Sequence, residues 1–268
     1  MARKTEINNM VYREQFKRKV KKEDIPTCNI LGTEILVGNM SWLVNYLTDN
    51  IKDLSGDYLT ITATNEIMMA YSDEKFYKCQ NGGVMSIPDG GPLKSYGQKC
   101  GYTDMERITG PDLMLELFKV SEDKGFRHYF YGTKQDTLDK MKARLEKEYP
   151  RLQIAGMRPS RFRDLTPEED QQMIREINDT NPDFIWFSLG APKGNYFAAE
   201  HQGILKGFMM SVGAGFDYYA GNIRRAPVWM QEHDLEWLYR IFQDPKRMMK
   251  RYFNIVPRFI LHAYILKK

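Results

Sequence analysis

The sequence predicts an α/β protein: a Rossmann-like three-layer fold with a mostly parallel sheet, followed by a C-terminal helical appendage that associates with a membrane. Three observations predict the fold. Short β-rich apolar runs alternate with helical patterns of about 10–16 residues. The run Asp183–Leu189 lacks polar alternation, as strands buried on both faces do. A chain of 268 residues with 42% hydrophobic residues can bury such a sheet between two helical layers.

The first half of the chain begins with a basic, weakly periodic segment, residues 1–27, which we expect to be a flexible or loosely helical extension. The elements that follow are predicted from apolar periodicity and β-branched composition. They are a strand at Ile30–Val37, a helix at Ser41–Ile51, a strand at Tyr58–Thr64, a helix at Glu66–Gln80 and a short strand at Val84–Ile87 that ends at Pro88-Asp89-Gly90-Gly91.

In the second half the same alternation continues, and two helix starts carry capping signals. Thr133 is the expected N-cap of one helix, and Thr166-Pro167-Glu168-Glu169 is a strong start for another. The predicted elements are a helix at Pro111–Lys124, a strand at Arg127–Tyr131, a helix at Thr133–Glu148, strands at Leu152–Ala155 and Asp183–Leu189, and an apolar run at Phe208–Val212.

Ligands of open α/β sheets bind at the carboxyl ends of strands, near a switch in strand order. This rule selects the loops after Thr62, Ile87, Leu189 and Val212 as candidate site loops.

Composition excludes several classes of protein. The 13% aromatic content and the hydrophobic fraction exclude dominant disorder, and a net charge of +4 argues against a wholly basic nucleic-acid binder. The three cysteines show no CxxC pair, so we expect a reducing cytoplasm and no disulfide framework. We also expect neither a signal peptide nor a transmembrane helix.

Charge is distributed unevenly along the chain. Residues 224–268 hold 10 Lys/Arg and 4 Asp/Glu, a net +6, whereas residues 1–223 hold 29 and 31, a net −2. We therefore divide the chain into an extension (1–27), a Rossmann-like core (28–223) and a basic appendage (224–268). The end of the appendage is amphipathic, basic and aromatic, with Pro257 inside it. A membrane-surface helix is favoured; a helix docked on the body and a nucleic-acid arm are the alternatives.

Two residues at strand or helix ends are candidates for chemistry. Asp89 lies in a Gly-flanked turn after a strand, where either a structural turn or a functional carboxylate is expected. Arg107 precedes a helix and could bind a phosphate there, or form a surface ion pair. Gly213-Ala214-Gly215 lacks the third glycine of a dinucleotide fingerprint, and no P-loop, no histidine metal spacing and no Asp-x-Asp occur. Neither a cofactor nor a metal is predicted.

One long string of motifs is specific. It runs Val212-Gly213-Ala214-Gly215-Phe216-Asp217, Ala220-Gly221, Arg225-Ala226-Pro227, Trp229-Met230, Leu235-Glu236-Trp237-Leu238-Tyr239-Arg240 and Asp244-Pro245-Lys246-Arg247. Earlier pieces agree in order: Thr62 and Glu66, Pro88-Asp89-Gly90, Glu106-Arg107-Ile108 and Leu189-Gly190-Ala191-Pro192-Lys193. From about Ile30 to Phe253 the sequence resembles the WecG/TagA/CpsF glycosyltransferases of bacterial surface-polysaccharide assembly.

The resemblance implies an inverting, metal-independent transfer of a hexose-type sugar. The implied donor is a nucleotide sugar, usually a UDP-sugar, and the acceptor is a polyprenyl-diphosphate-linked glycan at the cytoplasmic leaflet of the cell membrane. It gives Asp89 the role of general base. The substrate-binding positions that it implies are Thr62, Thr64, Glu66, Arg107, Lys193, Gly213, Gly215, Asp217, Arg240, Arg247 and Arg251.

The chain departs from the family pattern in two places. Thr64 stands where the family has Asn, and Gly194-Asn195 stands where it has Gln-Glu. The departures leave the donor sugar open. The expected location is peripheral, on an anionic membrane surface, with no nucleic-acid partner; a homo-oligomer is left open. A non-catalytic, membrane-associated partner of a polysaccharide assembly complex is the alternative function, and an NAD(P)-dependent enzyme is disfavoured by the missing glycine.

Overall fold

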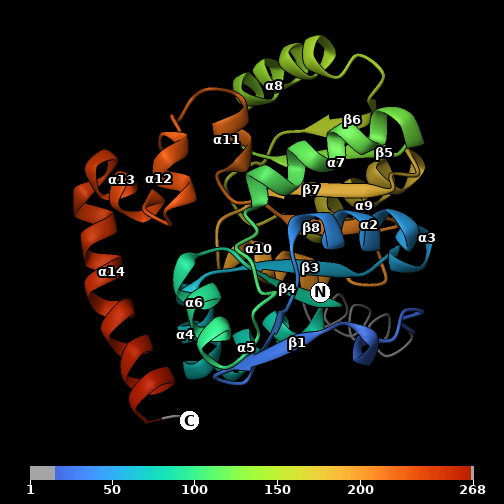
Figure 1. Ribbon diagram of the computed structural model, residues 1–268. Helices are drawn as coiled ribbons and strands as arrows, with labels where there is room; N and C mark the ends of the chain where they lie inside the picture. The colour runs from blue at the N-terminus through green and yellow to red at the C-terminus, as the bar shows by residue number, and fades with distance from the viewer. Residues whose placement is uncertain (1–15, 267–268) are drawn as a thin grey trace.

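A computed structural model of the protein describes residues 16–266, with the side chains of Arg247, Lys250 and Arg251 outside the description. Its centre is an eight-stranded sheet in the order β1-β2-β4-β3-β8-β7-β5-β6 (Figure 1). Strand β1 is antiparallel to β2, and the other pairs are parallel. The strands are β1 (Thr27–Ile30), β2 (Thr33–Leu36), β3 (Tyr58–Thr62), β4 (Met85–Pro88), β5 (Arg127–Gly132), β6 (Gln153–Arg158), β7 (Phe184–Ser188) and β8 (Phe208–Ser211).

Helices cover both faces of this sheet. They are α2 (Met40–Asp49), α3 (Ile51–Leu54), α4 (Thr64–Ser72), α5 (Glu74–Gly82), α6 (Gly91–Lys99), α7 (Gly110–Lys124), α8 (Gln135–Glu148), α9 (Pro167–Asp179), α10 (Lys193–Glu200) and α11 (Gly215–Tyr219). Three more helices, α12 (Val228–Glu232), α13 (Glu236–Gln243) and α14 (Pro245–Ile260), stand at one side of the body (Figure 1).

Two apolar clusters separate the layers. One joins buried residues of α2, α7, α8 and α11 to the sheet, with Phe118 and Trp186 at its centre. The other joins α5, α9 and α10 to the opposite face, around Tyr58 and Phe187. Trp186 and Phe187 are neighbours on β7 and are both fully buried, which explains why that strand shows no polar alternation. The predicted three-layer α/β class is confirmed.

Several predicted elements are present with shifted ends, and the Thr166 cap is confirmed: its hydroxyl accepts from the Glu169 N–H, and Glu169 accepts in return from the Thr166 N–H. The predicted N-cap Thr133 is wrong. The N-cap of α8 is Lys134, and Thr133 has a left-handed φ of 55°, so it ends the strand instead.

Two further predictions were wrong because a turn was missed. The stretch Ile30–Val37 is the turn and second strand of a hairpin, since Leu31 and Gly32 have φ of 50° and 86° and reverse the chain between β1 and β2. The stretch Glu66–Gln80 contains two helices. Asp73 is extended and its carboxylate accepts from the Phe76 N–H, so a new helix starts there.

The described part of the N-terminal segment contacts the body. The guanidinium of Arg18 pairs with the buried carboxylate of Asp57 and donates to the Gly82 carbonyl at 2.8 Å. Lys22 donates to the carbonyls of Asn81 and Gly83 at 2.8 and 3.1 Å. Residues 22–24 form a single 3₁₀ turn. The expected flexibility of residues 1–15 lies outside the described residues.

The last helix packs one face on the body. Phe259 and Ala263 are buried in a third apolar cluster with Ile30 and Leu93, and Tyr96 meets the rings of Phe259 and Tyr264 edge-on. The helix runs through Pro257 and continues as one π-helical turn, Leu261–Ile265. Docking on the body and contact with a membrane surface are therefore compatible for this helix, because α14 also has a second, exposed face.

Candidate active site

Three neighbouring strands bring the predicted site loops together. Thr62 ends β3, Asp89 follows β4 and Gly213 follows β8, and these strands are adjacent and parallel in the order β4-β3-β8. Their carboxyl ends therefore meet at one edge of the sheet. The Asp89 N–H donates to the Thr62 carbonyl at 2.7 Å, which extends the β3–β4 ladder by one bond and fixes the turn.

Asp89 is half-buried at this edge. Loss of hydration raises the pKa of its carboxyl to about 6. The positive charges of Arg240 and Arg107 act in the opposite direction, whereas the carboxylates of Glu236 and Glu66 raise the pKa further. A carboxylate with a pKa near neutrality is suited to accept a proton at physiological pH.

A buried polar network supports the β3 side of the site. The amide of Gln80 donates to the hydroxyls of Thr60 and Thr62 at 2.7 and 2.6 Å, and it accepts from the amide of Asn195 at 3.0 Å. The Thr62 hydroxyl is fully buried in this network, so the contact of Thr62 with Asp89 is made by its carbonyl. The network also gives a structural role to Asn195, the second residue of the Gly194-Asn195 departure from the family pattern.

The first residue of the same departure, Gly194, is enforced by packing. A Cβ at this position would lie 2.2 Å from the Ser211 hydroxyl oxygen and 2.6 Å from the Leu189 carbonyl oxygen. The Ser211 hydroxyl donates to that carbonyl at 3.0 Å. A glutamine side chain therefore does not fit here unless Ser211 and the backbone at Leu189 move.

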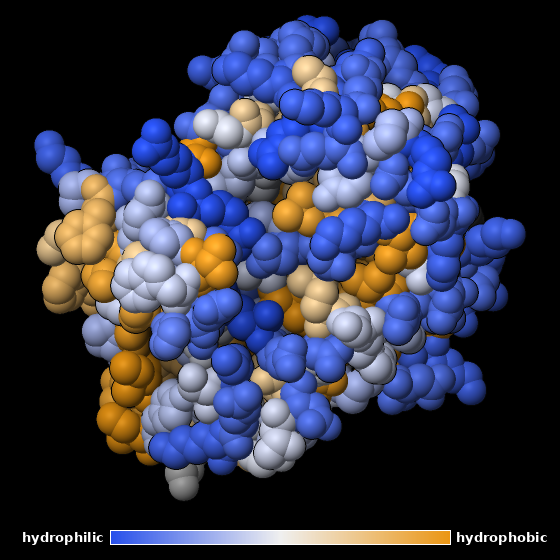
Figure 2. All heavy atoms as spheres, turned by 45° about the horizontal axis from the view of Figure 1, so that its top comes forward, coloured by the Kyte–Doolittle hydropathy of each residue, from blue (hydrophilic) through white to orange (hydrophobic). Residues whose placement is uncertain are grey.

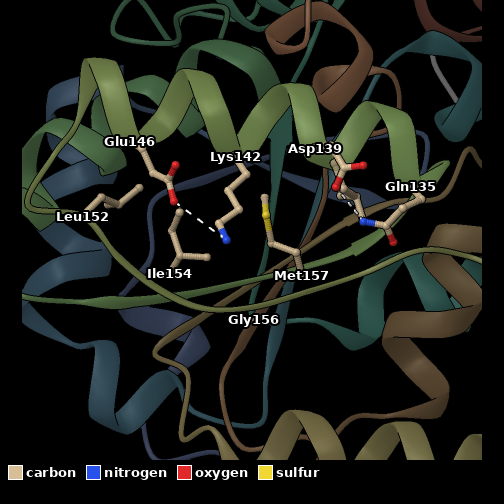
Figure 3. Close-up of a pocket in the computed structure, with 9 residues that line it drawn as sticks. Gln135, Asp139, Lys142, Glu146, Leu152, Ile154, Gly156 and Met157 are labelled. Carbon is tan, nitrogen blue, oxygen red and sulfur yellow. Dashed lines mark hydrogen bonds and ion pairs between the residues drawn. The ribbon is translucent and has the colours of Figure 1, made fainter.

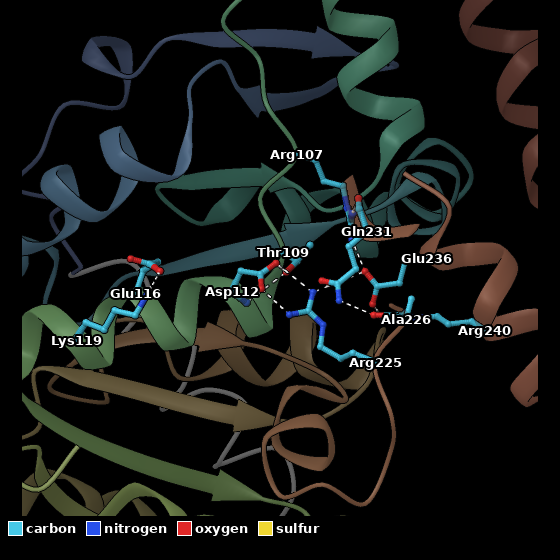
Figure 4. A network of polar contacts seen from close by, with 10 residues as sticks. All are labelled: Arg107, Thr109, Asp112, Glu116, Lys119, Arg225, Ala226, Gln231, Glu236 and Arg240. Atoms are coloured by element: carbon cyan, nitrogen blue, oxygen red, sulfur yellow. Dashed lines mark hydrogen bonds and ion pairs between the residues drawn. The ribbon is translucent and has the colours of Figure 1, made fainter. Parts of the chain in front are cut away.

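An arginine cluster gathers around Glu236 (Figure 4), and the charges of Arg107 and Arg240 act on the carboxyl of Asp89. Arg107 donates to the Gln231 carbonyl at 2.9 Å and pairs with the carboxylate of Glu236. Arg225 forms a bidentate pair with Asp112, at 2.5 and 3.1 Å. The predicted appendage thus contributes Glu236, Arg225 and Arg240 directly to the candidate site.

Arg240 was predicted as a site residue and lies on α13 within this cluster. Its guanidinium is 3.5 Å from Glu236 and lies over the ring of Tyr218, 5.5 Å from the ring centroid. The backbones of Arg247 and Arg251 belong to α14, but their side chains lie outside the described part of the structure, so their predicted roles stay predictions.

The remaining predicted residues are placed as follows. Thr64 and Glu66 are buried in the first turn of α4, where Glu66 accepts from the Ala63 N–H at 3.0 Å. Lys193 is exposed at the start of α10. Asp217 on α11 accepts from the side-chain amide of Asn222 at 3.0 Å.

The two glycines predicted to approach a nucleotide differ. Gly213 has a left-handed φ of 52°, and a Cβ at this position would meet no atom within 4 Å, so its backbone faces open space. Gly215 is packed against Met114 and Val212, where a Cβ would lie 3.1 Å from either side chain. Gly215 therefore lets α11 approach α7 and β8.

Sequence reasoning missed Glu236, Arg225 and Gln80. Glu236 and Arg225 both lie in the motif string that carries the family resemblance. The string therefore pointed to them, although reasoning about each residue by itself did not select either one. Nothing in the sequence predicts that Gln80 is buried in a polar network, since a glutamine on a helix is ordinarily exposed.

A cavity of about 480 Å³ lies elsewhere, between α8 and the edge strand β6 (Figure 3). Its walls include Leu152, Ile154 and Met157, and the Lys142–Glu146 ion pair stands at 3.8 Å beside it. Four strands separate β6 from β4, and no predicted site residue lines this cavity. Among residues 16–266, no group of three or more His, Cys, Asp or Glu is arranged to hold a metal ion.

Comparison with known proteins decides the family. The family model described as "Glycosyl transferase WecG/TagA/CpsF family" matches residues 28–268. The chain belongs to this family. The match includes the core, with Asp89, and the appendage, with Glu236 and Arg240, so both parts of the site lie within the family's own sequence range.

Two relatives of this WecG/TagA/CpsF family protein are named as enzymes. A Bacillus subtilis (strain 168) protein is 28% identical over 225 residues, which cover 83% of this chain and 85% of the relative. A Bacillus spizizenii protein is 25% identical over 206 residues, covering 76% and 78%. Both are named N-acetylglucosaminyldiphosphoundecaprenol N-acetyl-β-D-mannosaminyltransferase.

The appendage of this family member also carries an exposed apolar face. Apolar side chains gather along the edge that α13 and α14 form (Figure 2). No helix within residues 16–266 is both long enough and apolar enough to cross a membrane. The exposed large apolar residues of the appendage are Val228, Trp229, Trp237, Phe242, Met249, Phe253, Ile260, Leu261, Ile265 and Leu266.

Proposed function

We propose that this protein is an inverting glycosyltransferase that moves an N-acetylhexosamine or another hexose-type sugar from a UDP-sugar to a polyprenyl-diphosphate-linked glycan. The names of the two relatives support a lipid-diphosphate acceptor, since both describe transfer to N-acetylglucosaminyldiphosphoundecaprenol. The observation that carries the proposal is the carboxylate of Asp89, placed beside guanidinium groups at the carboxyl edge of the sheet.

The chemistry is a single displacement. The acceptor hydroxyl oxygen forms a bond to the anomeric carbon while the bond from that carbon to the nucleoside diphosphate breaks. Asp89 takes the hydroxyl proton, and the diphosphate leaves with the bonding electron pair. Arg240 and Arg107 are the cations that would stabilise the charge developing on the diphosphate. One base on one side of the sugar fits inversion at the anomeric carbon.

The direct test is a turnover assay with the purified chain. UDP-N-acetylhexosamines and other UDP-sugars are supplied with a short-chain N-acetylglucosamine diphosphate lipid analogue, and transfer is followed by mass spectrometry. Formation of a disaccharide-diphosphate lipid with an inverted anomeric centre is expected. No transfer with any donor would contradict the enzyme proposal and favour a non-catalytic partner of an assembly complex.

Chelation is expected to leave transfer unchanged. The sequence lacks Asp-x-Asp, and the arginine cluster can supply the positive charge that a divalent ion supplies in other enzymes. Rates with excess EDTA should therefore match rates with Mg²⁺ or Mn²⁺. Activity that is abolished by EDTA and restored by either ion would contradict metal independence.

Replacing Arg240 with Ala is expected to lower transfer to a soluble acceptor analogue by about 10- to 100-fold, because a charge-assisted contact with the diphosphate is lost. Arg258→Ala is the matched control, since Arg258 is exposed on the same appendage and bonds to Ser72 instead. Equal transfer by the two variants would exclude Arg240 from the diphosphate site.

The expected location is the cytoplasmic face of the cell membrane, with peripheral attachment through residues 224–268. The exposed apolar residues and the net +6 of this segment support that location. Attachment of the appendage would bring Asp89 close to a lipid-linked acceptor that does not leave the membrane.

A further inference from the structure

Glu236 is a buried carboxylate surrounded by guanidinium groups from three different segments. Arg107 comes from the segment between α6 and α7, Arg225 from the segment between α11 and α12, and Arg240 from α13. Arg107 pairs directly with one carboxylate oxygen of Glu236, Arg225 lies 3.8 Å from the same oxygen, and Arg240 lies 3.5 Å from the other. Glu236 is 7% exposed.

Other charges face the same arginines. Asp234 lies 3.7 Å from Arg107 and 3.4 Å from Lys94, and Asp112 binds Arg225. Tyr218 lies under Arg240. The charges of Arg107 and Arg240 also act on Asp89, and the carboxylate of Glu66 on α4 raises the pKa of the Asp89 carboxyl. In the ion pairs of this cluster, the cations Arg107, Arg225, Arg240 and Lys94 meet the anions Glu236, Asp234 and Asp112.

The cluster still has unused donors. The Nε atoms of Arg225 and Arg240 are buried and have no hydrogen-bond partner among the described residues. Buried donors of this kind are ordinarily paired, so these two point to an anion that completes the site when it binds. Glu236 therefore occupies part of an anion site without filling it.

Glu236 also shares its arginines with Asp89. Arg107 and Arg240 favour the ionised form of Asp89, and Glu236 opposes them. Without Glu236, the charges of Arg107 and Arg240 would stabilise the Asp89 carboxylate without opposition from this carboxylate, which would make Asp89 a weaker base. The same loss would remove the contact through which Arg107 on the body meets α13.

We propose that Glu236 is a positioning residue for the transfer reaction: it joins Arg107, Arg225 and Arg240 into one anion-binding cluster and balances their charge next to Asp89. This inference rests on the proposed function, in which Asp89 accepts the proton and the arginines meet the diphosphate. Glu236 touches neither reacting atom and acts through its partners.

The first test is the pH dependence of kcat/KM. The acidic limb of this pH profile reports ionisation of Asp89. Glu236→Gln removes one negative charge near Asp89 and so lowers its pKa, and the limb is expected to move to lower pH by about one unit. Glu236→Asp keeps the charge and should keep the limb in place. Glu232→Gln is the matched control: it makes the same charge change at an exposed position on α12. A limb that stays in place in Glu236→Gln would overturn the proposal.

The second test needs no turnover. Inorganic pyrophosphate is titrated into the full chain by calorimetry, and Glu236→Gln is expected to bind it about three- to tenfold more tightly, since a competing carboxylate charge is gone. Glutamine keeps the length of the side chain and an oxygen that accepts from the arginines, so this variant retains the joining role and changes only the charge. Unchanged or weaker binding would overturn the proposal. If wild type binds pyrophosphate but transfers no sugar, the proposed function fails while this titration still decides the role of Glu236.

A double variant covers the case in which Glu236→Gln does not fold. Glu236→Gln/Arg240→Gln removes both members of the 3.5 Å pair, and replacing both partners of a buried pair costs less than removing one. The net charge near Asp89 is then unchanged, so the acidic limb should remain within about 0.3 pH units of wild type. A shift of the acidic limb by a full pH unit in either direction would contradict the proposal that Glu236 balances the charge of the arginines.

Discussion

Asp89→Asn is expected to lower transfer by at least about 10²-fold, because the acceptor hydroxyl loses the group that takes its proton. Asparagine has nearly the same shape, and the Asp89 N–H bond to the Thr62 carbonyl does not involve the side chain. Folding and binding of the donor should therefore be retained. The rate is measured in the turnover assay, beside thermal melting and a titration with UDP.

The exposed residue Asp104 offers a matched control, since Asp104→Asn makes the same chemical change at an exposed position. Wild-type kcat/KM should be constant well above pH 6 and fall about tenfold per unit below it, since burial raises the Asp89 pKa to about 6 and only the ionised form accepts a proton. That limb should be absent in Asp89→Asn. Transfer by Asp89→Asn within about threefold of the control would remove Asp89 from the role of base.

The sheet could be predicted because its strands are short apolar runs with distinct boundaries. The strand at residues 184–187 needs no partner information, since all four side chains are apolar and fully buried. Turn chemistry was harder to predict. Leu31 has a left-handed φ that no local rule assigns to leucine, so apolar patterning alone predicts one strand where the structure has the β1–β2 hairpin.

The candidate site was predictable where a strand end fixes the residue. Asp89 follows β4 directly, and its position at the carboxyl edge follows from the topology. The arginine cluster was not predictable in this way. Arg107 and Glu236 are 129 residues apart, and their ion pair depends on how α12 and α13 fold back on the body. Only the motif string indicated that the appendage takes part in the site.

Membrane attachment was predicted from charge and periodicity, and the structure changes how it should be tested. Deleting residues 254–268 would remove Phe259 and Ala263 from a buried cluster that includes Ile30 and Leu93. Loss of a buried phenylalanine costs about 3–5 kcal/mol, so weaker vesicle binding by a truncated chain could come from damage to the body. Substitutions on the exposed face avoid this difficulty.

The triple variant Phe242→Ser/Phe253→Ser/Ile265→Ser is expected to bind anionic vesicles about 10²-fold more weakly than wild type. The three side chains are 75%, 71% and 66% exposed, so they contribute little to the folded body. In a bilayer interface each could bury apolar surface worth about 1 kcal/mol, and the sum corresponds to roughly two powers of ten. Flotation with vesicles of varied anionic content measures the change.

Transfer to a soluble acceptor analogue should separate attachment from catalysis. The triple variant leaves Asp89, Arg107 and Arg240 unchanged, so its rate on the soluble analogue should stay within about twofold of wild type, whereas its rate on vesicle-bound acceptor should fall with vesicle binding. Tyr102→Ser is the control, because Tyr102 is exposed outside the appendage. If the triple variant floats as well as this control, the exposed face does not meet the membrane, and basic charge alone holds the protein there. Raising the salt concentration would then release wild type and variant equally, since surface charge attraction is screened within about 10 Å at 0.1 M salt.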